Sequence, residues 1–373
     1  MPNSRGRVTI RELARATGLS PAAVSYALRG LHTSAETQRR VRRAAAELGY
    51  RAHPIARALA SGRTCTVGVL CGSLADHWQR DLAVRIGREL LEHNRYSIIV
   101  DAAGDPGREA ELARRLSGQQ VDGLIVQALD PAAPVWAELA EAVPIVPIGD
   151  ALTGNTRGEV VFDNRRGVTL ALEHLHGLGH RRVGVLTSTL ADTPDRPADV
   201  HVRAEAARLG LTVEVAVSGA GEHEAAGAAA RLLTRSPPPT AVFCFSDSIA
   251  YGVYAAARAL GLRVPQDVSI CGYDAHALSE LLTPSLTTVD WRLPEVAADA
   301  VSLMVAALDD DAPEPVVPGA RKGWRRAAGD GGGAGRRSGS GGGSRIVREP
   351  VLVPRGSTAP PGGAARTTDE VER

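Results

Sequence analysis

The sequence predicts a small all-α unit at the N-terminus, followed by a larger α/β core made of two doubly wound lobes. At 373 residues the chain is too long for one typical domain. Residues 1–63 contain twelve arginines against three acidic residues, whereas the rest of the chain has more acidic than basic groups. From Thr64 onward, short β-branched runs alternate with amphipathic segments, which is the pattern of parallel sheets covered by helices on both faces.

Helix-capping signals divide the N-terminal unit into helices. Thr9 and Glu12 have the spacing of a capping box, in which the hydroxyl and the carboxylate each accept a backbone N–H of the first turn. Gly18 has the position of a C-terminal cap, because glycine adopts the left-handed conformation at little cost. Ser20 is a second N-cap, and Pro21 follows at the first helical position, where its missing N–H is not needed. Two short helices joined by a tight turn are therefore expected.

The packing positions and the charge of this unit favour a helix-turn-helix. Ala14 is small where the two helices would cross, and Val24 and Leu28 supply the buried face of the second helix. A third helix is expected from residue 34 to residue 49, with an arginine-rich outer face. Any small helical hairpin would share part of this pattern, but the spacing, the caps and the positive charge together indicate DNA binding.

The core is expected to contain two series of strands and helices. The strands of the first series are expected at 66–70, 96–100, 122–126 and 143–149, with helices around 82–90 and 107–117. The second series is expected to have strands at 182–188, 211–217, 241–246 and 268–274, with helices at 166–178, 200–209, 222–234 and 247–260. In doubly wound folds the ligand cleft lies at the carboxyl ends of the strands, so a cleft is expected there.

Residues 312–344 interrupt this pattern with a run of glycine, serine and arginine. Such a composition buries too little apolar area to order itself, so a disordered insertion in a surface loop is predicted. The alternative is that its arginines contact nucleic acid. Residues 345–360 return to strand-like character and are assigned to the core, and residues 361–373 are predicted to be a disordered tail.

The sequence shows no signature of a catalytic, metal or cofactor site. It contains neither a P-loop nor a G-x-S-x-G motif, and the single Gly219-Ala-Gly221 is weak evidence for nucleotide binding. His174 and His176 are two residues apart and would not face one another on a helix. The four cysteines lack C-x-x-C spacing and lie in or beside apolar runs, which predicts buried reduced thiols.

The sequence also lacks signals for export or for a membrane. No apolar stretch approaches the roughly 20 residues needed to span a bilayer. The N-terminus, MPNSRGRVTI, has no apolar region typical of a secretory signal. A cytoplasmic protein without membrane contact is therefore expected.

The chain resembles the lac repressor family. The resemblance begins with the headpiece and hinge over residues 8–63, which contain Val-Ser-x-x-Leu in the second helix, Gly-Tyr before the hinge and Ile-Ala-Arg-Ala-Leu-Ala within it. It continues through nearly the whole chain, interrupted mainly by the Gly-rich segment. It implies a helix-turn-helix headpiece at 1–51, a hinge helix at 52–63, and a periplasmic-binding-protein-like core of two lobes at 64–311 plus 345–360.

By this resemblance the second helix lies in the major groove of DNA and the hinge lies in the minor groove. Arg29 is the candidate for reading guanine or for holding a phosphate, two roles that the sequence leaves open. Leu59 matches the family's wedge between base steps, with an ordinary core residue as the alternative. The DNA-contacting residues expected from the resemblance are Thr9, Ser20, Pro21, Ala22, Ser25, Tyr26, Arg29, His53, Arg57 and Leu59.

The resemblance also places a small-molecule pocket between the lobes. Asp274 would accept hydrogen bonds from ligand hydroxyls, with an ordinary loop carboxylate as the alternative, and Trp78 would stack on a ring, with a core role as the alternative. Ser246 follows another strand, and Arg196 lies in the loop that usually supplies a ligand-binding arginine. Ala198 stands where the family most often has a sugar-binding arginine, so the ligand is not a standard hexose on this pattern.

The function implied is a sequence-specific repressor, active as a homodimer on a pseudo-palindromic operator and controlled by a sugar or related metabolite. Effector binding would weaken the DNA complex, although corepression is the alternative. Three other classes share part of the pattern. They are a solute-binding protein, a sugar-processing enzyme that carries a DNA-binding domain, and a nucleoid protein without sequence preference.

Overall fold

The computed structural model forms two compact units, divided between Cys65 and Thr66, and each is described here by itself. The structure describes residues 8–30, 33–50, 63–119, 121–188, 197–219, 221–310 and 344–362. Residues 52–62 of the predicted hinge helix, 312–343 of the predicted Gly-rich insertion and 363–373 of the predicted tail lie outside these residues.

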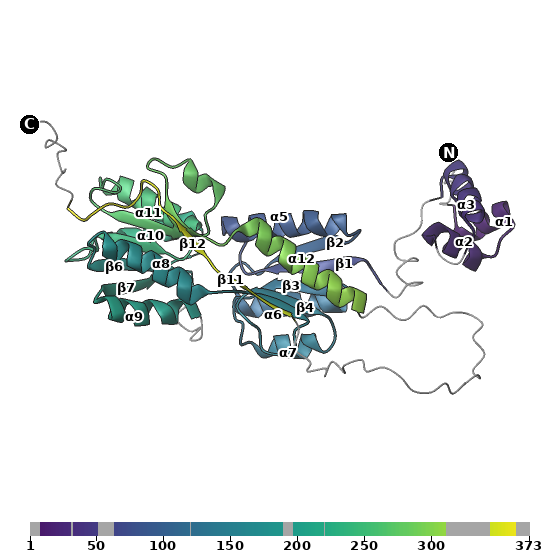
Figure 1. The fold of residues 1–373 in the computed structure, drawn as a ribbon, viewed down its shortest axis with the longest axis horizontal. Helices are drawn as coiled ribbons and strands as arrows, with labels where there is room; N and C mark the ends of the chain where they lie inside the picture. The colour runs from purple at the N-terminus through teal and green to yellow at the C-terminus, as the bar shows by residue number, and fades with distance from the viewer. Residues whose placement is uncertain are drawn as a thin grey trace, which may run out of the picture. The chain divides into compact units, whose positions relative to one another are not determined.

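The described residues of the first unit form a bundle of three helices whose caps are those expected from the sequence. Thr9 accepts from the Glu12 N–H while the Glu12 carboxylate accepts from the Thr9 N–H at 2.7 Å, which confirms the capping box. Gly18 adopts a left-handed φ of 65° after the first helix. The helices, shown in Figure 1, are α1 (Ile10–Thr17), α2 (Pro21–Arg29) and α3 (Ala35–Leu48). Their buried core consists of Leu13, Ala14, Val24, Ala27, Val41 and Ala45.

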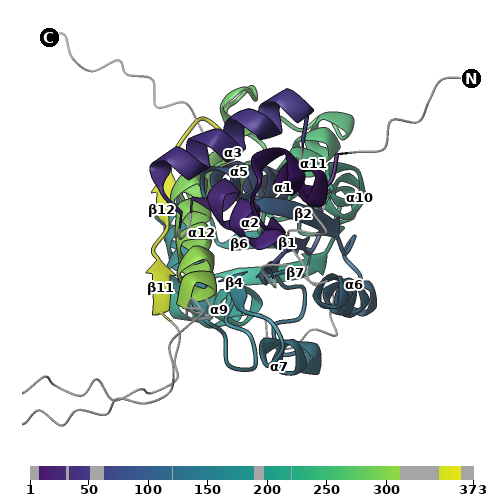
Figure 2. The same cartoon turned by 90° about the vertical axis from the view of Figure 1, so that its right-hand side faces the viewer.

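The first lobe of the core is a wholly parallel sheet in the strand order β11-β5-β4-β3-β1-β2. Alternate residues of each strand point to opposite faces, so Val69 packs beneath one helical layer and Leu70 beneath the other. Figure 2 shows α5 and α12 on one face and α6 with α7 on the other. The strands are β1 (Thr66–Cys71), β2 (Tyr96–Asp101), β3 (Gly123–Gln127), β4 (Ile145–Gly149), β5 (Gly158–Phe162) and β11 (Ser344–Arg348). The helices are α5 (His77–Glu92), α6 (Pro106–Gly118), α7 (Pro134–Ala140) and α12 (Leu293–Asp310).

The second lobe repeats this plan with one antiparallel edge strand, in the order β12-β10-β9-β8-β6-β7. Helices α8 and α9 cover one face, and α10 and α11 cover the other. The strands are β6 (Arg182–Thr187), β7 (Thr212–Val217), β8 (Ala241–Cys244), β9 (Ser269–Tyr273), β10 (Thr287–Asp290) and β12 (Val351–Val353). The helices are α8 (Asn164–Gly177), α9 (Pro197–Leu209), α10 (Glu222–Leu233), α11 (Asp247–Ala259) and the 3₁₀ turn η1 (Ala277–Glu280).

The lobes are not the two simple tandem series that the sequence pattern suggested. Residues 143–149 do not close the first series, because β5 follows and completes that sheet. After β10 the chain returns to the first lobe as α12, which packs against α5, β4 and β5. The final segment then contributes β11 to the first lobe and β12 to the second. The chain therefore crosses between the lobes three times, which joins them into one core.

The cysteines agree with the expectation of buried thiols at three positions and differ at one. Cys71, Cys244 and Cys271 are buried and free, and burial raises the pKa of Cys71 to about 12, which keeps its thiol protonated. Cys65 is only half-buried, because it lies before the first strand of the core rather than inside it.

Candidate functional site

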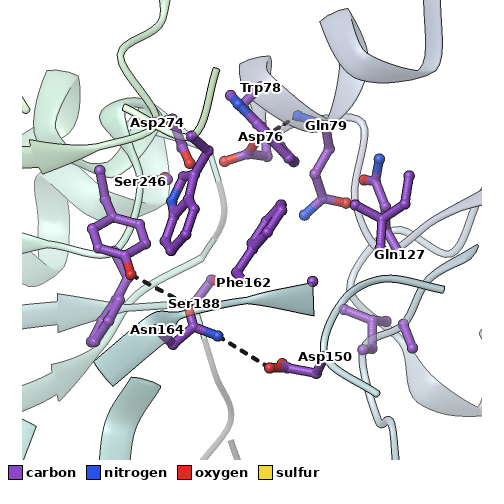
Figure 3. Close-up of a pocket in the computed structure, with 18 of the residues that line it drawn as sticks. Asp76, Trp78, Gln79, Gln127, Asp150, Phe162, Asn164, Ser188, Ser246 and Asp274 are labelled. Carbon is purple, nitrogen blue, oxygen red and sulfur yellow. Dashed lines mark hydrogen bonds between the residues drawn. The ribbon is translucent and has the colours of Figure 1, made fainter. Parts of the chain in front are cut away.

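A pocket of the core lies where the carboxyl ends of the two sheets face each other (Figure 3). It encloses about 150 Å³. Its walls come from residues at the ends of β1, β3, β4 and β5 in one lobe and of β6, β8, β9 and β10 in the other. In the first sheet β1 lies between β2 and β3, and in the second β6 lies between β7 and β8, so the order of strands reverses at the first strand of each sheet. Such switch points form the ligand crevices of doubly wound folds.

Aromatic rings form the central wall of this pocket. Phe162 at the end of β5 stacks on Trp291 with ring centroids 4.5 Å apart and an interplanar angle of 17°. Trp78, on the first turn of α5, packs edge-on against Phe162 at 5.6 Å. Only 3% of the residues are aromatic, so this concentration is a specific feature of the pocket. Flat apolar surfaces of this kind bind rings and also attract cations.

Two carboxylates face the pocket from opposite lobes. Asp76 caps α5 and accepts from the Gln79 N–H at 2.9 Å and from the Ser246 hydroxyl of the other lobe. Asp274 follows β9 with a φ of 139° and accepts from the Asp247 N–H at 3.4 Å. Burial raises the pKa of both carboxyls, and the negative charges of Asp76 and Asp247 raise that of Asp274 further.

Asp247 is a structural acid behind the pocket rather than part of its wall. It is only 1% exposed and accepts from the Tyr273 and His276 N–H groups at 2.9 and 2.8 Å. The hydroxyls of Ser279 and Thr288 each donate to it at 2.6 Å. Four donors hold this carboxylate in place, so it fixes the loop after β9 and thereby the position of Asp274.

Two buried side chains of the pocket have polar atoms without a partner in the described structure. Both amide atoms of Gln127 lack a hydrogen bond although the residue is 7% exposed. The indole Nε1 of Trp78 also lacks one at 6% exposure. A buried polar atom left without a partner costs free energy, so both groups indicate a ligand or water in the pocket. Nearby, Asn164 Nδ2 donates to Asp150 at 3.1 Å and Asn164 Oδ1 accepts from Tyr273.

A second set of contacts joins the lobes beside the pocket. The His77 N–H at the start of α5 donates to Ser248 Oγ at 2.9 Å, and its ring lies 3.6 Å from the Glu222 carboxylate. His276 Nε2 lies 3.0 Å from Asp81 Oδ2, and this histidine is 9% exposed. These groups come from α5 on one side and from the second lobe on the other, so they hold the two lobes together at the rim.

The surface of the helical unit combines small residues with positive charge. Pro21 and Ala22 at the start of α2 are exposed, and Ser25 and Tyr26 on its next turn are half-buried. Ser20 Oγ accepts from the Ala23 N–H at 3.2 Å, which leaves its hydroxyl hydrogen available as a donor. The exposed face of α3 carries Arg39, Arg40, Arg42 and Arg43. A helix N-terminus beside such a face suits the phosphates of nucleic acid.

Comparison with known proteins covers both units. The chain is 30% identical to the ribose operon repressor of Haemophilus influenzae over 302 residues, which are 80% of this chain and 91% of that protein. This chain belongs to the LacI family of transcriptional regulators. A model described as a periplasmic binding protein-like domain matches residues 172–325.

Solved structures of the LacI family share the fold. The lac repressor dimer bound to operator and the anti-inducer ONPF matches with a TM-score of 0.75 at 22% identity, over 95% of this chain and all of that chain. A complex of the transcriptional regulator CelR with cellobiose matches with a TM-score of 0.62 at 25% identity, over 94% of this chain and all of that one. The expected fold class, a helix-turn-helix headpiece with a periplasmic-binding-protein-like core, is confirmed, and the protein is a DNA-binding transcriptional regulator.

The structure brings together three of the four residues expected to bind effector in this LacI-family protein. Trp78, Ser246 and Asp274 line the same pocket, while Arg196 lies outside the described residues. Sequence reasoning missed Asp76, Gln127, Asp150, Phe162, Asn164 and Trp291. Asp150 directly follows an expected strand, so reading the residue after every strand, as was done for Asp274, would have found it. Phe162 and Trp291 stand at the ends of β5 and β10, two short strands that were not expected from the sequence.

The headpiece residues expected at DNA occupy one end and one face of the first two helices. Thr9 differs from the rest, since its hydroxyl donates to the Glu12 carboxylate at 3.0 Å and a phosphate would compete with that bond. Arg29 belongs to α2, but its side chain lies outside the described part, as do His53, Arg57 and Leu59.

Two searches of the described residues bear on other classes of protein. Within these ranges no helix combines the length and apolar character needed to cross a membrane. The same ranges contain no group of three histidine, cysteine or acidic side chains arranged to hold a metal ion. The histidines near the end of α8 bond within the second lobe instead: His174 to Thr358, and His180 to Thr240, Ser269 and the Ala359 carbonyl.

Proposed function

We propose that this LacI-family regulator is a repressor that binds a pseudo-palindromic operator as a homodimer and leaves it when a small metabolite occupies the pocket between the lobes. The pocket carries the proposal, because its walls come from both lobes in nearly equal measure. A ligand that contacts both lobes binds their closed arrangement more tightly than an open one, and only such differential binding shifts an equilibrium. The protein would act in the cytoplasm, beside the chromosome.

The proposed effector is a sugar or a related small metabolite. A regulator of similar fold forms a complex with cellobiose. In this chain the aromatic wall and the ring of hydrogen-bonding groups suit a small hydroxylated ring. The binding residues proposed are Trp78, Ser246 and Asp274 from the sequence, with Arg196 added from the loop outside the described residues. The relatives are transcriptional repressors, and we propose that this chain likewise carries out no catalysis.

The division of the chain supports these roles. We propose that residues 1–51 read DNA, that residues 52–63 form a hinge helix, and that the core comprises residues 64–311 and 345–360. The base-facing residues proposed are Pro21, Ala22, Ser25, Tyr26 and Arg29. In the hinge, His53, Arg57 and Leu59 are proposed to lie in or along the minor groove.

Selection of genomic fragments by purified full-length protein, at near-physiological salt because DNA affinity depends on salt, tests the function. One palindromic motif beside a few genes is the expected result, and candidate effectors would follow from the products of those genes. Enrichment without a motif would contradict sequence-specific regulation. A metabolite that tightened the complex instead of releasing it would make the protein a corepressed regulator.

The wedge role proposed for Leu59 has a separate test. Leu59→Ala should reduce both the bend of the selected operator and the specific affinity, because an inserted side chain unstacks a base step and the bent duplex gains protein contacts. Leu59→Met, which keeps a long apolar side chain, is the matched control. Equal bending by all three proteins would remove the wedge role.

A further inference from the structure

The ionisable side chains that line the effector pocket are all acids in the described structure. The charged side chains of its wall are Asp76, Asp150 and Asp274, and no lysine, arginine or histidine stands among the described lining residues. A phosphate or carboxylate ligand would meet repulsion from every charged group in this wall.

Two of these carboxylates come from opposite lobes and lie close enough together that the charge of Asp76 raises the pKa of Asp274. Asp76 comes from the first lobe and has two donors, the Gln79 N–H and the Ser246 hydroxyl. Asp274 comes from the second lobe and is held in place by a loop that Asp247 fixes, with another negative charge behind it. Buried like charges repel strongly unless a proton or a cation lies between them. The described lining residues therefore supply no positive charge at the point where the lobes meet.

The aromatic wall lies beside the same carboxylates. Trp78 follows Asp76 by two residues, and Figure 3 shows Phe162 near both of them. Phe162 in turn stacks on Trp291. The faces of such rings attract an ammonium group, and the attraction grows when water is excluded. A cationic ligand would therefore gain both an ion pair with the carboxylates and a cation–π contact with the rings. A neutral sugar would gain only the ring contact and hydrogen bonds.

The unpartnered polar atoms point to a ligand with hydrogen-bonding groups of both kinds. Gln127 offers a carbonyl acceptor and an amide donor, and both are buried without a partner in the described structure. The Trp78 indole offers a further donor. A ligand with an N–H group and hydroxyl or carbonyl oxygens would satisfy all three atoms.

We propose that the effector is a small hydroxylated amine, such as an amino sugar, whose ammonium group lies between Asp76 and Asp274 while its hydroxyl groups meet Gln127 and Trp78. This inference rests on the proposed function. The ammonium neutralises the two carboxylates only when the lobes are together, so its binding favours the closed core. The positive charge of the ligand thus contributes both to the choice of ligand and to the change in lobe arrangement that controls DNA binding.

The test compares ligands that share a ring and differ in charge. Full-length protein is titrated by calorimetry with hexosamines, with their N-acetyl derivatives and parent hexoses, and with the hexose 6-phosphates. A general library of small amines, neutral polyols and organic phosphates is screened in parallel for release of the selected operator. The amines are expected to bind at least about tenfold more tightly than neutral counterparts, since one desolvated charge interaction is worth about that factor.

Variants assign this preference to the pocket. Asp274→Asn and Asp76→Asn each remove one charge and keep hydrogen-bonding ability, and asparagine also caps a helix as aspartate does. Each is expected to bring amine and neutral ligands within about threefold of each other. Glu138→Gln is the matched control, since Glu138 is an exposed acid on α7 outside the pocket, and it should leave the preference unchanged.

The outcomes separate this inference from the proposed function. Operator release by neutral or phosphorylated compounds, with amines no better, would overturn the amine and leave effector control in place. An amine preference that persists in both aspartate variants would also overturn the assigned site. If no compound of any charge binds the core or releases DNA, effector control itself fails, and the proposed function fails with it.

Discussion

At the scale of single residues, Asp274 and Ser246 were expected from the family resemblance, and both stand at the end of an apolar strand that the sequence shows. Asp150 was missed although it directly follows the strand expected at 143–149. Phe162 and Trp291 were missed because the short strands β5 and β10, at whose ends they stand, were not recognised. Gln127 is the last residue of a recognised strand, and only its burial without a partner distinguishes it.

The raised pKa of Asp274 predicts how the unliganded core responds to pH. Because the pKa is higher in the folded protein than in the unfolded chain, the folded state is favoured at low pH, and this stabilisation is lost as pH rises through the folded pKa. Asp274→Asn removes the titration, so its melting temperature should exceed that of the wild type by a margin that grows from about pH 5 to about pH 8. Thermal unfolding of both proteins across this range measures the margin.

Asp267→Asn is a control of opposite sign. Arg263 lowers the pKa of Asp267 to about 2, so this carboxylate stabilises the folded state above its ordinary pKa and loses that effect on acidification. The variant should be slightly less stable than the wild type at neutral pH, with a difference that shrinks as the pH falls. Parallel curves for wild type and Asp274→Asn would contradict the pH prediction.

At the scale of elements, capping residues and apolar strands made the headpiece and most of the core predictable. The segments that failed were short or lacked a clear signal: α7 has seven residues, β10 has four, and β5 contains a single alternation. Helix α12 is long and apolar, but nothing local shows that it returns to the first lobe. That return depends on tertiary packing, which periodicity does not encode.

The N-cap of α2 predicts a measurable share of headpiece stability. Ser20→Ala removes the acceptor of the Ala23 N–H and should cost about 1 kcal/mol of unfolding free energy. Ser20→Asn retains a capping acceptor and should cost little by comparison. Urea unfolding of the isolated residues 1–63, followed by circular dichroism, measures both. If Ser20→Ala and Ser20→Asn are equally stable, the cap does not contribute as argued.

Helices α10 and α11 are in close contact because of one glycine. A Cβ on Gly252 would lie 2.5 Å from the Glu222 carbonyl and 2.6 Å from the Ala225 Cβ. Gly252→Ala should therefore separate the helices and destabilise the second lobe by about 1–3 kcal/mol.

Gly227, on α10 itself, provides the control, since it is exposed and a Cβ added there would meet nothing nearer than 3.8 Å. Gly227→Ala should instead stabilise the helix by about 0.5–1 kcal/mol. Denaturant melts that showed the same sign for both would refute this packing argument.

At the scale of the whole core, three chain crossings and the contacts at the pocket rim connect the two lobes, so the arrangement of the lobes and the binding of a ligand are coupled. The resemblance predicted two lobes with a ligand between them, but the rim contacts of His77 and His276 were not visible in the sequence, because their partners are far away along the chain. A ligand in the pocket and contacts at the rim favour the same closed arrangement. Loss of a rim contact should therefore weaken ligand binding without any change in the pocket.

The pair of Asp81 and His276 makes this coupling testable. Asp81→Asn weakens a contact between the lobes that is worth about 1 kcal/mol at a half-exposed position. Because apparent affinity falls with the fraction of protein in the binding-competent state, effector affinity should drop about fivefold. Arg85→Gln on the same helix, whose side chain pairs with Glu89 within α5, is the control and should leave affinity unchanged. Small-angle scattering of the unliganded proteins should show a larger radius of gyration for Asp81→Asn alone. A fivefold loss without that expansion would place the effect in the pocket rather than in lobe closure.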